Sequence, residues 1–106
     1  MPQDQIIKDP NKLLEELEHL HPSDIANSLK KIEKNSEADF FFVLKKLPDD
    51  ILGEVLLELP ENLREDAYSE LTIEQLTEAV DELESDDQTD IIQELEEFDE
   101  EKAKEI

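Results

Sequence analysis

The chain has 106 residues, the size of one domain, and its 32 acidic and 10 basic side chains leave a net charge of −22. A strongly negative charge argues against binding to nucleic acids and against insertion into anionic membranes, because affinity for phosphate comes from Lys and Arg. The absence of cysteine excludes disulfides, thiolate metal sites and a cysteine nucleophile.

This charge alone would fit a disordered chain. However, Leu, Ile, Val and Phe make up 32 of the 106 residues, more than is typical of disorder. These residues also recur periodically along the chain, which indicates a buried face. We therefore predict one ordered domain, residues 1–106, with a highly charged exterior. The chain stops in helix-like sequence, which favours an N-terminal fragment of a longer protein.

The first part of the chain contains three helix-start signals. Asp9 is a candidate N-cap with Pro10 at the first helical position. The pattern restarts at His21–Asp24, and Ser36 is suited to cap a third helix. The predicted helices cover residues 10–20, 22–33 and 36–46.

Three consecutive aromatic residues, Phe40, Phe41 and Phe42, lie in the third predicted helix. Successive helical residues are about 100° apart, so the three rings cannot all face one neighbour. One interpretation is that preceding and following helices cover two faces of this helix. The other is that one Phe is exposed and docks a partner domain.

A regular array begins at Leu47, and leucine recurs every twelve residues up to Leu95. Each unit combines one short amphipathic helix with a tight turn. A helix of about ten residues is only ~15 Å long and cannot bury its apolar stripe alone, whereas stacked neighbours can. The pattern predicts an all-α solenoid of about seven or eight short helices. The remaining predicted helices cover 48–58, 60–70, 72–82 and 86–97, followed by a frayed last turn.

Two details of the array predict local structure. Thr72 with Gln75 and Ser85 with Gln88 both match the capping-box pattern. Gly53 lies inside a predicted helix, where it costs about 1 kcal/mol relative to Ala. Close approach of a neighbouring helix would explain its presence.

The acidic residues are concentrated in the second half of the chain. Residues 1–53 hold eleven acidic residues and seven lysines, whereas residues 54–106 hold 21 acidic and three basic residues. From Glu65 to Glu101 there are seventeen carboxylates and no basic side chain. Since like charges repel in the compact state, cations are the expected compensation.

The residue types do not predict an enzyme. The two histidines, His19 and His21, lie at a helix end and a turn, and no nucleophile has an evident base beside it. Oxygen-only ligands suit Mg²⁺, Ca²⁺ or Mn²⁺. The candidate ligands are Asp86, Asp87 and Asp90, because Asp86 and Asp90 project from one helix face. The alternative is that these residues only stabilise a helix N-terminus.

Four segments carry a resemblance to a known family: Leu20–Ala26, Leu47–Pro48, Leu59–Pro60 and Ser85–Ile92. Together they resemble the cytosolic N-terminal domain of MgtE-type magnesium transporters, over about Leu13 to Phe98. The resemblance implies a right-handed superhelix that precedes CBS domains, a connecting helix and a membrane pore. It also implies cytosolic Mg²⁺, bound weakly between this domain and the CBS domains, that holds the pore closed.

The family motif has Asp-Pro where this chain has Glu84-Ser85, while Asp86, Asp87 and Asp90 match. The resemblance implies a regulatory domain at the cytoplasmic side of the cell membrane, in a homodimeric transporter. It implies neither catalysis nor direct membrane insertion, and the longest apolar run, Phe40–Leu44, is too short to span a bilayer. The alternative is a protein-interaction solenoid like the middle domain of the flagellar rotor protein FliG.

Overall fold

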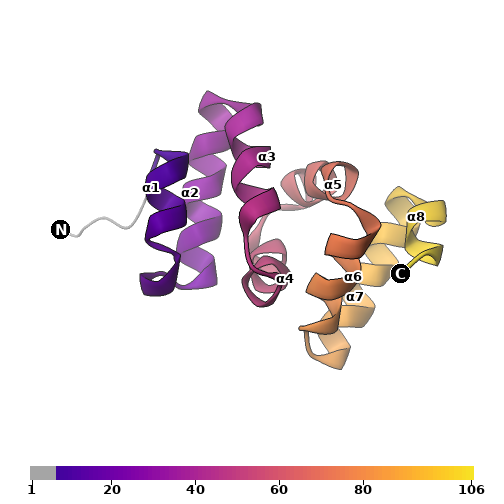
Figure 1. The fold of residues 1–106 in the computed structure, drawn as a ribbon. Helices are drawn as coiled ribbons and strands as arrows, with labels where there is room; N and C mark the ends of the chain where they lie inside the picture. Colours follow the sequence, from indigo (N-terminus) through magenta and orange to yellow (C-terminus); the bar gives the residue numbers. More distant parts are fainter. Residues whose placement is uncertain (1–6) are drawn as a thin grey trace.

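The computed structural model describes residues 7–106, and every regular element in this range is helical (Figure 1). The elements in chain order are α1 (Pro10–Glu15), the 3₁₀ helix η1 (Leu17–His19), α2 (Pro22–Asn35), α3 (Glu37–Lys46), α4 (Asp49–Glu58), α5 (Glu61–Glu70), α6 (Ile73–Asp81), α7 (Ser85–Phe98) and α8 (Glu100–Lys104). The all-helical prediction is confirmed.

The predicted first helix, residues 10–20, is wrong in one respect, because it divides into α1 and η1. The N–H of His19 donates to the carbonyl of Glu16, and that of Leu20 to Leu17, which are 3₁₀ spacings. His21 precedes Pro22 and is extended, at φ −81° and ψ 157°, because proline disfavours the α conformation in the residue before it. The tighter last turn leads the chain into that break.

The helices stack in two rows, and within a row each helix contacts the next helix but one in the sequence. One row contains α1, α3, α5 and α7, and the other contains α2, α4 and α6. Figure 1 shows the rows running from the α1–α2 end to α8, and the fold measures 43 × 26 × 19 Å. This pattern of contacts is consistent with the predicted solenoid. The right-handed superhelical path stays a prediction.

The leucines of the twelve-residue period are all buried; the first four lie in turns, and Leu95 lies inside α7. Leu47, Leu59, Leu71, Leu83 and Leu95 are at most 7% exposed. The first three are extended residues that end helices α3, α4 and α5. Each turn from α3 to α7 therefore contributes a leucine to the core. Pro48 and Pro60 enforce the extended conformation of the leucines before them.

The three consecutive phenylalanines have three different environments. Phe40 is fully buried in the single hydrophobic core, and Phe41 is half-buried against it. Phe42 is 40% exposed, and Lys46 Nζ lies 5.3 Å from the centre of its ring. Two of the three rings are therefore covered, and the third, Phe42, is exposed, while its docking to a partner domain stays a prediction.

The helix starts agree with most of the capping predictions. Asp9 caps α1 through the N–H of Asn11, at 2.9 Å, and Ser36 caps α3. Thr72 and Gln75 form the predicted capping box, with N–H to side-chain distances of 3.0 and 3.1 Å.

The second predicted capping box, Ser85 with Gln88, is wrong. Ser85 is already the first helical residue of α7, after Glu84 as N-cap. The Gln88 side-chain amide donates to the Leu83 carbonyl at 2.9 Å. It is oriented toward the preceding turn and does not bond the N-cap backbone.

Gly53 lies where α4 meets α6. A Cβ atom at this position would be 2.6 Å from the Ala79 carbonyl oxygen and 3.0 Å from a methyl group of Leu83. The predicted close approach of a neighbouring helix is confirmed, and the neighbour is α6.

Candidate metal-binding surface

The aspartates predicted from the sequence lie in the first turns of α7. Asp86 and Asp90 are exposed, as predicted, and Asp87 is half-buried. Their i,i+4 spacing within α7 places Asp86 and Asp90 on one face. Within residues 7–106 no hydrogen bond or ion pair engages their side chains. Both carboxylates are accessible to a hydrated cation or to a partner domain.

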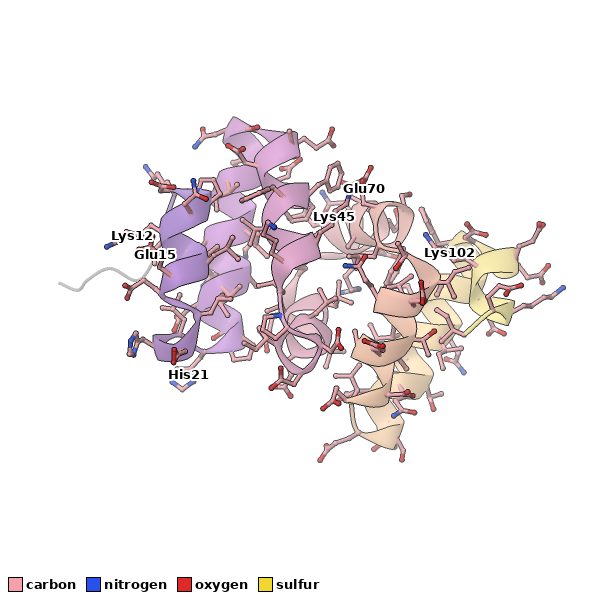
Figure 2. The ribbon with its side chains drawn as sticks, viewed as in Figure 1. Lys12, Glu15, His21, Lys45, Glu70 and Lys102 are labelled. Atoms are coloured by element: carbon pink, nitrogen blue, oxygen red, sulfur yellow. The ribbon has the colours of Figure 1, made fainter. Side chains whose placement is uncertain are left out.

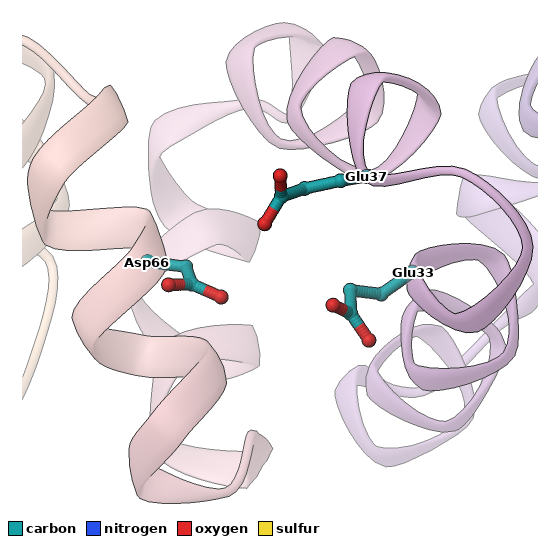
Figure 3. Close-up of side chains that lie close together, drawn as sticks. All are labelled: Glu33, Glu37 and Asp66. Atoms are coloured by element: carbon teal, nitrogen blue, oxygen red, sulfur yellow. The ribbon is translucent and has the colours of Figure 1, made fainter.

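A second acidic cluster is formed by three helices that meet (Figure 3). Glu33 comes from the last turns of α2, Glu37 from the first turn of α3 and Asp66 from the middle of α5. One carboxylate oxygen from each lies within 4.8 Å of the others. No local pattern in the sequence reveals this cluster, since Asp66 is 29 positions after Glu37 and only the packing of α5 brings it there.

The spacing of these three oxygens limits how an ion could bind. Opposite ligands of a bare Mg²⁺ are about 4.2 Å apart, twice a metal–oxygen distance of about 2.1 Å, and Ca²⁺ spans about 5 Å. The three oxygens all lie within 4.8 Å of one another, which is compatible with either ion, bound directly or through its water. Glu33 and Asp66 are half-buried and Glu37 is exposed, so water can reach the cluster.

A third group of acidic residues joins α4 to α6. The carboxylate of Asp49, in the first turn of α4, contacts Glu78 of α6 closely enough to share a proton. This hydrogen bond, together with repulsion from Asp49, Glu74 and Asp81, raises the pKa of Glu78. Like charges therefore lie close together where α4 meets α6.

One acidic residue of the second half is fully compensated. Glu94 of α7 accepts from Arg64 Nε at 2.7 Å, from Arg64 Nη2 at 2.8 Å and from the Tyr68 hydroxyl at 2.6 Å. The bond to Arg64 holds the pKa of Glu94 below its usual range. Burial, with the bond to Glu94, raises the pKa of Tyr68. This network fastens α5 to α7 and is structural.

Ion pairs are few for a chain with 32 acidic residues. Among the described residues they are Arg64–Glu94 and Lys45–Glu70, the latter at 3.2 Å between α3 and α5 (Figure 2). Most carboxylates therefore have no cation within the fold, and the surface they form can attract divalent ions by charge.

The histidines do not join any of these clusters. His19 and His21 are both exposed. The backbone N–H of His21 donates to Asp24 at the start of α2, at 3.3 Å. The arrangement offers carboxylate oxygens only, which suits Mg²⁺ or Ca²⁺ and not zinc or copper.

Comparison with known protein families identifies a match to one of them. The model of the MgtE intracellular N domain family matches residues 20–106, a segment that includes all three acidic clusters. No curated protein and no solved structure matches significantly. In the part of the chain that the structure describes, no helix has both the length and the apolar character needed to cross a bilayer.

Proposed function

The chain belongs to the family of MgtE intracellular N domains, the cytosolic domains of magnesium transporters, and from this premise we propose that it senses Mg²⁺ and regulates the transporter pore. The family match over residues 20–106 carries the proposal. The match favours a transporter domain over the FliG-like interaction module. The matched family consists of regulatory domains and not of enzymes.

The proposed mechanism starts from the unbalanced charge. At low Mg²⁺ the carboxylates of the second half repel one another and any acidic partner surface. Hydrated Mg²⁺ keeps most of its water and needs only one or two carboxylates from each side. Ions bound between this domain and the CBS domains of the same transporter would neutralise both surfaces and hold the domains together, and with them the closed pore.

Two surfaces are candidates for this role. Asp86 and Asp90, with Asp87 beside them, form an exposed pair without internal partners, which suits an ion shared with another domain. Glu33, Glu37 and Asp66 contribute oxygens from three helices of this domain, which suits an ion held within the fold. An ion at Asp86 and Asp90 would link this domain to another domain. An ion at Glu33, Glu37 and Asp66 would stabilise the packing of α2, α3 and α5.

We predict that replacing Asp86 and Asp90 with Asn shifts Mg²⁺-dependent closure of the complete transporter to higher Mg²⁺. In the isolated chain the double variant should unfold at nearly the wild-type temperature, because both side chains are exposed and Asn also favours helix starts. If the aspartates served only the helix dipole, the variant would lose ~0.5–1 kcal/mol of stability and gate normally.

The matched control is Glu96→Gln with Glu97→Gln, which removes two exposed charges from the same helix. An equal gating shift in this control would mean that net charge, and not the position of the aspartates, sets the response. Mg²⁺ titration followed by amide NMR, at constant ionic strength, would locate the ion. Shifts around Glu33, Glu37 and Asp66 that survive D86N/D90N would assign the internal cluster instead.

A further inference from the structure

Within residues 7–106, three lysines gather on one face of α2, apart from the acidic surfaces. A hollow of about 250 Å³ lies against α2, and its lining includes Asn27, Lys30, Lys31 and Lys34. These positions recur at i, i+3, i+4 and i+7, so they form one face of the helix. Lys30 is half-buried, and the other three side chains are exposed.

In the part of the chain that the structure describes, the lysines of the hollow form no ion pairs. No ion pair in residues 7–106 involves Lys30, Lys31 or Lys34, although the chain has 32 acidic residues. The acidic residue nearest in sequence, Glu33, belongs to the cluster with Glu37 and Asp66. Lys30 and Lys34 are instead i,i+4 neighbours of the same charge, which destabilises a helix.

The helix dipole accounts for only part of this arrangement. Cations favour the last turn of a helix, and Lys34 occupies the last turn of α2. Lys30 lies a full turn earlier, where the dipole effect has decayed. The dipole also does not explain why the lysines line a hollow together with the Asn27 side chain.

We propose that this hollow binds a compact phosphate-bearing anion with at least two negative charges. Each ammonium group offers three hydrogen-bond donors and the Asn27 amide offers two more, which matches the acceptor oxygens of phosphate. The volume of about 250 Å³ is below that of most pockets for drug-sized ligands. The four residues provide no aromatic ring for stacking a nucleobase, so the recognised group is the phosphate.

The charge of the rest of the molecule favours a small ligand over an extended one. Figure 1 shows α2 near the N-terminal end, with α6 and α7 toward the other end of a fold 43 Å long. Screening limits charge effects to about 8 Å at physiological salt, so a compact anion at α2 is shielded from the carboxylates of α6 and α7 in the acidic half. A long polyanion would meet that half as well.

The test is binding of pyrophosphate to the 106-residue chain, measured by calorimetry in Mg²⁺-free buffer so that a metal-bound ligand on the acidic surface does not contribute. We expect Lys31→Gln with Lys34→Gln to weaken binding about tenfold or more, since two charge-assisted bonds are lost. Lys46→Gln with Lys104→Gln removes the same charge elsewhere and should leave affinity within about twofold.

A second arm separates the two sources of phosphate. Vesicles of phosphatidylcholine, with and without a phosphatidylinositol phosphate, are sedimented with the chain. Lysine-dependent pyrophosphate binding identifies a soluble ligand, and lysine-dependent binding to the phosphoinositide vesicles alone identifies a lipid headgroup. Absence of binding in both arms, or binding that the hollow variant and the control variant weaken equally, would overturn the proposal. Because it does not involve Mg²⁺, its failure would leave the sensor function unaffected.

Discussion

Two glutamates, Glu78 and Glu94, show how the fold changes the same side chain in opposite directions. A hydrogen bond with Asp49 and the repulsion from it raise the pKa of Glu78, so the charged form of Glu78 is disfavoured in the folded state. Glu94 accepts three hydrogen bonds from Arg64 and Tyr68, and its pKa is lowered. In a chain of net charge −22, an acidic residue stabilises the fold where a fixed donor reaches it.

The first stability prediction concerns Glu94→Gln, which we expect to cost about 1–2 kcal/mol at pH 7, because the bidentate charged bond with Arg64 is broken and is only partly solvent-screened. The folded pKa of Glu94 is below the unfolded value. Its contribution is therefore complete above the unfolded pKa and is lost as pH falls through the folded pKa. Urea unfolding should show the wild type and variant converging at acidic pH.

Glu96→Gln is the control for this prediction, because it removes one exposed acidic charge from the same helix. It should match or slightly exceed wild-type stability across the pH range. A constant difference between Glu94→Gln and wild type down to the lowest pH would contradict the assigned role of the Arg64 pair.

At the scale of elements, the helices are short, and contacts with the next helix but one hold them in place. The contact between α4 and α6 is a close one, because Gly53 has no side chain and the Ala79 backbone can approach it. The α5–α7 contact depends instead on polar anchors, since Arg64, Tyr68 and Glu94 bridge the helices. Lys102 of α8 also donates to the Tyr68 carbonyl at 2.6 Å.

The prediction at this scale is that Gly53→Ala destabilises the domain, although alanine gains about 1 kcal/mol of helix propensity. The new methyl group would lie 2.6 Å from a backbone oxygen that cannot rotate away, and overpacking of this kind typically costs about 1–3 kcal/mol. Thermal unfolding should show a lower Tm. Adding Leu83→Ala should not restore it, because the main clash is with backbone, and an increase in Tm for Gly53→Ala would refute the close α4–α6 contact.

At the scale of the whole molecule, the hydrophobic core and the net charge oppose each other. One continuous core runs from Leu13 to Ala103, while the second half of the chain carries 21 acidic and three basic residues. Burial favours the compact state and self-repulsion disfavours it. Divalent cations are the means by which this balance would shift.

We expect Mg²⁺ to raise the Tm of the chain more than NaCl at equal ionic strength. For one weak site with a dissociation constant near ~1 mM, ~10 mM Mg²⁺ would add about 1.4 kcal/mol, a shift of several degrees for a domain of this size. Monovalent salt screens the charges but does not bridge them. Equal melting shifts in the two salts would remove the case for specific sites.

Local sequence was sufficient for most of the helical framework. The twelve-residue leucine period, Pro48 and Pro60 predicted helices α4 to α7, and Asp9, Ser36 and Thr72 predicted caps that the structure contains. These features depend on residues three or four positions apart, whose relative geometry is set by the helix itself. The exposure of Asp86 and Asp90 was also predictable, because no basic residue lies nearby in sequence.

Tertiary structure alone decided the contacts between distant segments. The cluster of Glu33, Glu37 and Asp66, and the pair of Arg64 with Glu94, join residues about thirty positions apart. Their proximity depends on the crossing angle at every intervening turn, and small differences accumulate along a solenoid. Phe42 is exposed because no neighbouring helix covers it fully. Gln88 bonds to Leu83 because the preceding turn brings that carbonyl within its reach.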